Sequence, residues 1–166
     1  MVARRSLWRG LTVLCAAASL AACNSMIPTV DFGFSSPGPA PQLVKARQAR
    51  FAFAPIVGPA TPISDLMQRI NASAGARKLP IVPFGDANAT YIVKGHLSAV
   101  GGRNQGTLIY VWDIVDRQDR RIFRVSGQED TGGGAPDPWV NVRGGTLGIV
   151  ATRTVDAIAA WLSNQP

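Results

Sequence analysis

Three consecutive stretches, Tyr91–Val100 (YIVKGHLSAV), Thr107–Val115 (TLIYVWDIV) and Arg121–Gly127 (RIFRVSG), decide the fold of this 166-residue chain. They are rich in β-branched and aromatic residues, which favour strands. The linkers at residues 101–106 and 116–119 are short and hold Gly, Asn and Asp, which accept the backbone angles of tight turns. Together the three stretches predict an antiparallel meander.

Two strands and two helices are predicted around the meander. Residues 50–57 (RFAFAPIV) alternate as a strand does, and residues 79–84 (LPIVPF) fit an edge strand because proline cannot donate to a central ladder. Residues 61–76 and 147–162 repeat apolar side chains every three or four positions, and a glycine-rich break at 131–138 precedes the second repeat. We therefore predict an α+β fold, a mixed, largely antiparallel sheet of about five strands with two helices packed on it.

The first 22 residues have the features of an export signal. Arg4, Arg5 and Arg9 provide a positively charged start, and an apolar run follows at residues 10–20. This run is shorter than the roughly 20 apolar residues that a membrane-spanning helix needs. It is therefore interpreted as a targeting segment.

The stretch Leu20-Ala21-Ala22-Cys23 resembles the lipobox of bacterial lipoproteins. The resemblance implies that residues 1–22 are a signal peptide and that Cys23 carries acyl chains such as palmitate, which anchor durably when there is more than one. Asn24 is not the aspartate that retains lipoproteins at the inner membrane, so the resemblance implies the periplasmic face of the outer membrane. An ordinary secretory signal with an incidental cysteine is the alternative.

Residues 23–47 are expected to be the lipidated cysteine and a flexible tether rich in Pro, Gly and Ser, and residues 48–166 a single periplasmic domain. Three of the 17 basic residues lie in the signal, so 14 basic against 10 acidic residues leave a charge of +4. Such a surplus suits ordinary solubility as well as an anionic surface.

The sequence lacks the sets of residues that catalytic and metal sites require. Once Cys23 is lipidated no thiol remains, and His96 is the chain's one histidine, so we expect no zinc, haem or iron–sulfur site and no cofactor. His96 alternates with Lys94 and Ser98 on one strand face, where such neighbours stand side by side without a third group to orient the base. We expect no catalytic residue.

The carboxylates and glycines also fit structural roles. Asp113 lies within an apolar strand and is predicted to pair with Arg121 or Arg124 on the neighbouring strand. The glycines at residues 132–134 are not followed by the lysine and hydroxyl residues of a phosphate-binding loop. They are interpreted as a flexible loop.

The strand at residues 107–115 has one aromatic side and one β-branched side. If both helices pack on the β-branched side, the aromatic side stays open, with basic groups of the neighbouring strands beside it and one further tryptophan in the following loop. The candidate partner-binding residues are Tyr110, Trp112, Lys94, His96, Arg124 and Trp139. The alternative is that the strand aromatics are core and that the loop tryptophan is a plug.

Element order, size and the proposed anchor resemble the TolB amino-terminal domain and related small lipoproteins such as the LpoB-type activators. The segments Tyr110–Asp113 and Ala159–Leu162 also resemble parts of short lipoproteins of Gram-negative bacteria. The proposed anchor, the tether and the lack of catalytic residue sets together indicate a non-enzymatic scaffold or accessory factor in envelope assembly or maintenance. Its expected partner is an envelope protein or peptidoglycan, and export excludes nucleic acid. A small-ligand carrier or envelope hydrolase with a pocket between sheet and helices is the alternative.

Overall fold

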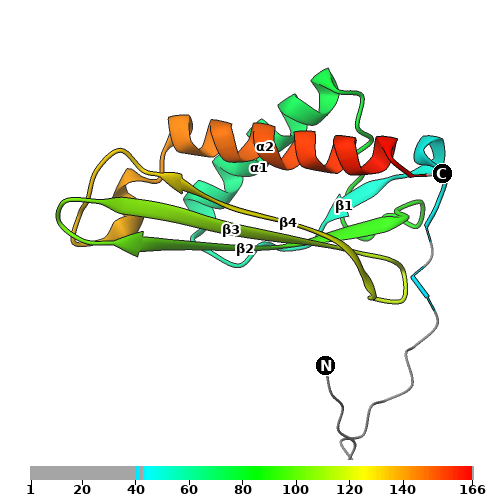
Figure 1. Cartoon of the computed structure of the whole chain (residues 1–166), viewed down its shortest axis with the longest axis horizontal. Helices are drawn as coiled ribbons and strands as arrows, with labels where there is room; N and C mark the ends of the chain where they lie inside the picture. The colour runs from blue at the N-terminus through cyan, green and yellow to red at the C-terminus, as the bar shows by residue number, and fades with distance from the viewer. Residues whose placement is uncertain (1–39, 42, 166) are drawn as a thin grey trace, which may run out of the picture. The chain divides into compact units, whose positions relative to one another are not determined.

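A computed structural model describes residues 40, 41 and 43–165, so the predicted signal peptide, Cys23 and most of the predicted tether lie outside the described residues. Its elements in chain order (Figure 1) are η1 (Ala46–Gln48), β1 (Phe51–Phe53), α1 (Ala60–Ala76), β2 (Tyr91–Gly101), β3 (Gly106–Val115), β4 (Arg121–Asp130), η2 (Pro138–Asn141) and α2 (Gly144–Ser163). Within the described residues, no helix has both the length and the apolar character to cross a bilayer.

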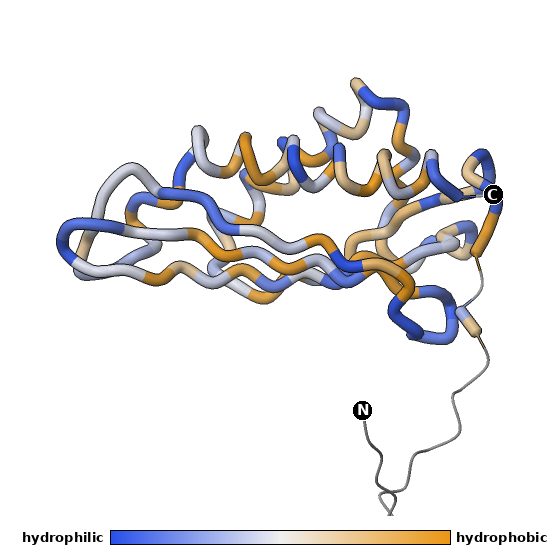
Figure 2. Tube along the Cα trace, in the orientation of Figure 1, coloured by the Kyte–Doolittle hydropathy of each residue, from blue (hydrophilic) through white to orange (hydrophobic). Residues whose placement is uncertain are grey.

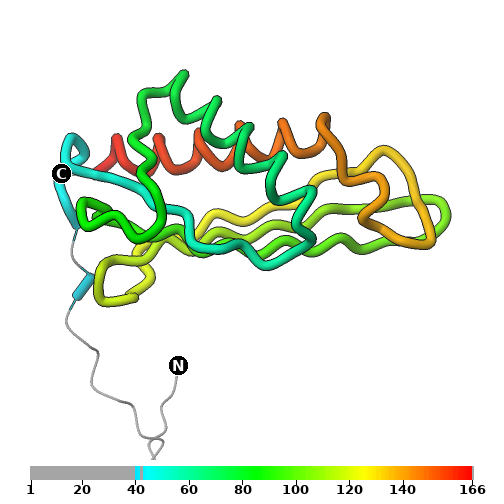
Figure 3. Tube along the Cα trace, turned by 180° about the vertical axis from the view of Figure 1, so that it is seen from behind, coloured from blue at the N-terminus to red at the C-terminus, as the bar shows by residue number. Residues whose placement is uncertain are grey.

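The four strands form one sheet in the order β1-β2-β3-β4. β1 runs parallel to β2, whereas β2, β3 and β4 are antiparallel neighbours joined by hairpins, as predicted for the meander. Both helices lie on the same side of this sheet, which Figures 1 and 3 show from opposite directions. The α+β class with two helices on a mixed sheet is therefore confirmed.

The predicted edge strand at residues 79–84 is wrong. This segment makes a single parallel bridge, between Ile81 and Phe51, and no ladder. The Phe51 amide donates to the carbonyl of Pro80 and the Val82 amide donates to the carbonyl of Phe51, each within 3.0 Å. Pro83 has no amide hydrogen with which to continue the pairing. The sheet therefore has four strands rather than the predicted five or so.

The two helices bury the apolar positions that predicted them. α1 begins at Ala60, two residues before Pro62, although proline favours the first helical position, and the extended Pro59 stands at the N-cap position. α1 ends at Ala76, and Lys78 follows in the left-handed region with a φ of 55°. The fully buried residues of the two helices are Leu66 and Ile70 on α1, and Val150, Ala151, Thr154, Val155 and Ile158 on α2.

The core lies between the helices and the sheet face that they cover. Figure 2 shows apolar residues along both the strands and the helices, whereas the β3–β4 hairpin is largely hydrophilic. Phe51, Tyr91 and Trp161 meet edge to face or tilted, with ring centroids 5.4 to 6.5 Å apart. Trp161 also stacks on Phe123 at 5.2 Å, which ties the last turns of α2 to β4.

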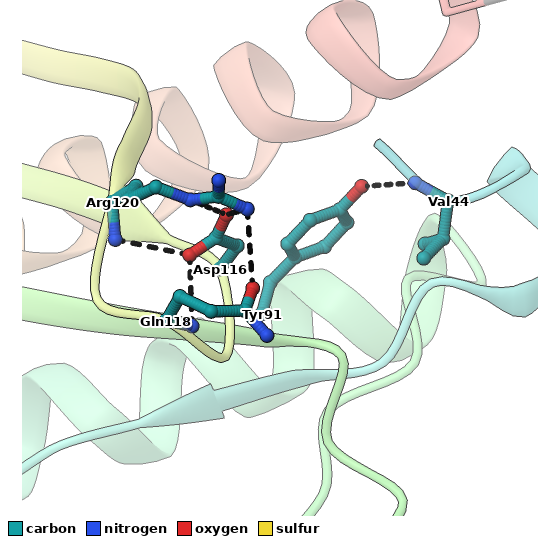
Figure 4. Close-up of polar contacts among 5 residues, drawn as sticks. All are labelled: Val44, Tyr91, Asp116, Gln118 and Arg120. Atoms are coloured by element: carbon teal, nitrogen blue, oxygen red, sulfur yellow. Dashed lines mark hydrogen bonds and ion pairs between the residues drawn. The ribbon is translucent and has the colours of Figure 1, made fainter. Parts of the chain in front are cut away.

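The chain joins this core earlier than predicted. The Val44 amide donates to the Tyr91 hydroxyl at 2.8 Å (Figure 4), and the Val44 side chain packs against the core. The turn η1 follows directly. Residues 44–47, assigned above to the tether, therefore belong to the folded domain.

Candidate partner-binding face

The helices leave one face of the meander uncovered, and this uncovered surface is named the open face here. Cross-strand partners share a face, so the register of β2, β3 and β4 defines its members. They are Lys94, His96, Ser98 and Val100 on β2, Thr107, Ile109, Val111 and Asp113 on β3, and Arg124, Ser126, Gln128 and Asp130 on β4. Every one of these side chains is exposed or half-buried.

Apolar side chains occupy the middle of the open face. Ile109 and Val111 follow each other along the central strand β3, and Val111 lies between His96 and Ser126. Val57 continues this row beyond His96 through an isolated parallel bridge, and its side chain is 59% exposed. Antiparallel sheets with one solvated face usually alternate apolar-in with polar-out, so exposed apolar side chains on the outer face depart from the simple pattern.

A row of charges crosses the face next to this apolar centre. Arg124 holds Asp113 with two parallel hydrogen bonds, Nε to Oδ1 and Nη2 to Oδ2, each 2.6 Å long, and Arg121 stands 3.8 Å from the same carboxylate. The Arg124 guanidinium is the main reason why the pKa of Asp113 lies below its ordinary value. Lys94 pairs with Asp119 at 2.5 Å. The predicted pairing of Asp113 with the arginines of the neighbouring strand is confirmed.

The predicted membership of the face is half wrong. Lys94, His96 and Arg124 lie on the open face, but Tyr110 and Trp112 point to the opposite side, where they are 3% and 0% exposed. Both helices pack on the aromatic side, not on the β-branched side as the partner-binding hypothesis required. Burial, assisted by the nearby Glu129 carboxylate, raises the pKa of the Tyr110 phenol above its ordinary value. The alternative that assigned both aromatics to the core is correct.

Two glycines explain why the aromatic side accepts the helices. Gly95 is the cross-strand partner of Trp112, and Gly127 is that of Tyr110. A β-carbon on either glycine would overlap the facing ring, so each ring lies across a bare stretch of backbone. Flat-lying rings leave room above the sheet for α1 and α2, and they bury the most apolar area per side chain.

Trp139 also belongs to the core side. It lies in η2, where the Asp137 carboxylate accepts a hydrogen bond from its amide at 3.0 Å and caps the turn. Its ring packs against the hydrophobic core and passes close to Gly58. Trp139 is therefore a half-buried plug, not an exposed anchor.

Two features of the described residues bear on metal and ligand binding. No three His, Cys, Asp or Glu side chains cluster there as metal ligands would. An apolar hollow of about 270 Å³ lies between α1 and the chain that leaves β1, lined in part by Phe53, Ile63, Met67 and Phe84. No lining residue of this hollow is titratable.

The missed members of the open face are Ile109, Val111 and Val57. The alternation along β3 was readable, but both of its sides are apolar, so the local pattern did not say which one stays uncovered. Val57 was assigned to the end of a predicted strand, and its place beside His96 depends on a bridge across 39 residues.

No protein-family model matches the chain, and no curated protein matches it in sequence. Among solved structures, a PelC dodecamer from Paraburkholderia phytofirmans matches with a TM-score of 0.46 and 12% identity, covering 77% of this chain and 96% of PelC. A single-residue variant of that PelC dodecamer matches at 0.49 and 9% identity, covering 76% and 95%. TolB from Acinetobacter baumannii matches at 0.41 and 12% identity, covering 78% of this chain and 31% of TolB.

Proposed function

We propose that this chain is a lipid-anchored protein of the bacterial outer membrane whose periplasmic domain binds a protein partner through the open face and performs no catalysis. The lipobox-like stretch that ends at Cys23 supports the anchor. The open face is the observation that carries the binding role. In this proposal the domain serves as a scaffold or accessory factor in envelope assembly or maintenance, and peptidoglycan is the alternative ligand.

The composition of the open face supports a partner rather than bare solvent. Ile109 and Val111 form an apolar centre, and Ser98, Ser126 and Gln128 surround it with neutral polar groups. An apolar centre with a polar rim is the usual anatomy of a protein interface. The two hydrogen bonds between Asp113 and Arg124, beside this centre, hold two opposite charges in a fixed orientation. Charges held in this way favour specificity over affinity.

The test is capture of the partner from crosslinked envelopes with two matched variants. V111K places a charge at the centre of the open face, whereas I149K places the same charge at an exposed apolar residue of α2, where Ile149 is 46% exposed. We expect V111K to abolish capture of a protein that the wild type and I149K both retain, with all three melting at similar temperatures. Equal capture by a folded V111K variant would remove the open face from the proposal.

The anchor needs its own measurement. Mass spectrometry of the protein from native membranes should show a mature chain that begins at Cys23 with acyl chains attached. A mature chain with a free Cys23 thiol would contradict the anchor, whatever the capture experiment shows.

The alternative function, a small-ligand carrier, is favoured by one observation, the apolar hollow beside Phe53 and Met67. Its lining suits a short hydrocarbon chain and offers no group for hydrolysis. Fluorescence of a bound apolar dye should then fall in a Met67→Lys variant, whereas V111K should leave it unchanged.

A further inference from the structure

Three segments meet at the end of the domain where the chain enters. This tether end consists of residues 43–50, which include η1, the β3–β4 hairpin and residues 86–90 between them. The Arg117 guanidinium, from the hairpin, donates to the carbonyls of Ala87 and Ala89 at 2.9 and 3.0 Å. The Thr90 hydroxyl accepts a hydrogen bond from the Arg50 amide at 2.8 Å, which joins the same segment to the residues that follow η1.

The β3–β4 hairpin at this end is held rigid from within. The Asp116 carboxylate, 3% exposed, accepts hydrogen bonds from the amides of Gln118 and Arg120 and from the Arg120 guanidinium, all between 2.7 and 3.0 Å (Figure 4). The neighbouring Tyr91 hydroxyl holds the Val44 amide. The side chains on these segments are therefore presented on a fixed frame.

Positive charge is concentrated on this frame. Among the described residues, no carboxylate pairs with any of four cations at the tether end, Lys45, Arg47, Arg50 and Arg117. The carboxylates at this end are Asp86, Asp116 and Asp119, of which Asp116 pairs with Arg120 and Asp119 pairs with Lys94 of β2. These four cations and Arg120, set against three carboxylates, leave this end with a net charge of +2.

The far end of the domain has no such surplus. It comprises the β2–β3 hairpin and the chain from Asp130, the last residue of β4, to Arg143, the N-cap of α2, at the opposite end of the sheet in Figure 1. Its charged residues are Arg103 and Arg143 against Asp130 and Asp137, so its net charge is zero. The excess positive charge therefore lies at the tether end and not at the far end.

We propose that the tether end binds the anionic lipid headgroups of the bilayer in which Cys23 is anchored. This inference rests on the proposed lipid anchor, because Leu43 follows Cys23 by 20 residues. The chain enters the domain at the tether end, so a Cys23 anchor holds this part of the domain nearest the membrane. Lysine and arginine side chains are attracted to an anionic lipid surface within a Debye length of about 8–10 Å.

This orientation fits the proposed role of the open face. Strands β2, β3 and β4 run between the tether end and the far end (Figure 1). Binding of headgroups at the tether end therefore orients these strands away from the plane of the bilayer. The open face then points sideways into the periplasm, clear of the lipid.

The experiment uses an unacylated chain from Asn24 to Pro166. Every described core residue lies between Val44 and Leu162, so this chain keeps the whole core. Binding is measured by cosedimentation with vesicles of phosphatidylglycerol and phosphatidylcholine, against vesicles of phosphatidylcholine alone, at low and at physiological salt. The matched variants are R47E at the tether end and R103E at the far end, because each reverses one exposed arginine that pairs with no carboxylate among the described residues. A double variant, K45E/R47E, increases the effect.

We expect salt-sensitive binding to the anionic vesicles only. Each cation near such a surface contributes about fivefold to partitioning, so K45E/R47E should weaken binding by about tenfold or more and R103E should leave it unchanged. Equal losses in R47E and R103E would show an effect of net charge alone and would overturn the inference. So would binding to a soluble polyanion such as heparin without binding to anionic vesicles. The state of Cys23 in native protein is measured separately, so loss of the anchor and loss of the headgroup surface are distinguishable.

Discussion

The indole ring of Trp112 lies across Gly95, its direct partner on the neighbouring strand, so that the ring occupies the space where any other residue would carry its β-carbon. Trp112 is fully buried and meets Phe53 edge to face at 5.8 Å. The same arrangement recurs one strand over, where Tyr110 lies across Gly127. These two ring-over-glycine pairs lie on the face of the sheet that the helices cover. The opposite face is therefore the open face.

Gly95→Ala is expected to destabilise the domain. The added methyl group would overlap the Trp112 ring, which is enclosed by the core and cannot move away, and overpacking of this kind costs about 1–3 kcal/mol. Urea denaturation should show a lower midpoint. Gly102→Ala is the matched control, because nothing lies within 4 Å of a β-carbon there. If the two variants unfold at the same urea concentration, the close packing of Trp112 on Gly95 is wrong.

Tyr91→Phe should loosen the start of the domain without unfolding it. The substitution removes the acceptor of the Val44 amide but keeps the ring contacts with Phe51 and Trp161. A lost hydrogen bond of this kind costs about 0.5–1.5 kcal/mol. Hydrogen exchange at the Val44 amide should become faster, whereas Tyr110→Phe should leave that amide unchanged. Unchanged protection in Tyr91→Phe would mean that Val44 is held by something else.

Asp116→Ala should destabilise the β3–β4 hairpin. The variant leaves the amides of Gln118 and Arg120 without their acceptor, and a loss of this kind costs about 1–3 kcal/mol for a buried group. Asp116→Asn keeps an acceptor for the amides but loses the charge opposite Arg120, so its unfolding free energy should fall between those of wild type and Asp116→Ala. The control Asp119→Asn changes a residue at a φ of 63°, which asparagine tolerates, and should have little effect.

Asp113 should contribute to stability in a pH-dependent way. Its pKa is lowered in the folded protein, chiefly by the Arg124 guanidinium, so the native state favours the ionised carboxylate. The contribution is therefore full above the ordinary value of 3.8 and is lost as the pH falls through the lowered native pKa. NMR titration should give a pKa for Asp113 that rises toward the ordinary value in Arg124→Gln. An Asp113 pKa that is the same in both proteins would contradict the bidentate pair.

Local sequence determined much of this fold. Helical spacing at residues 61–76 and 147–162 located α1 and α2 to within a few residues, and alternation with turn-forming linkers located β2, β3 and β4. The Asp113–Arg124 pair followed as well, because hairpin partners are close in sequence. Such features depend on neighbours within about a dozen residues, which is the range over which periodicity and turn chemistry act.

Tertiary structure decided the rest. Both sides of β3 are apolar, so only the packing of distant helices over Trp112 and Tyr110, made possible by Gly95 and Gly127, determined which side is covered and which is the open face. Contacts between remote segments also limit the pairing of residues 80–83 with β1 to a single bridge. They likewise place Val44 on Tyr91, 47 residues away. The physical reason is the same in each case. A local sequence pattern shows which apolar surfaces could be buried, but which of them pack together depends on the whole chain.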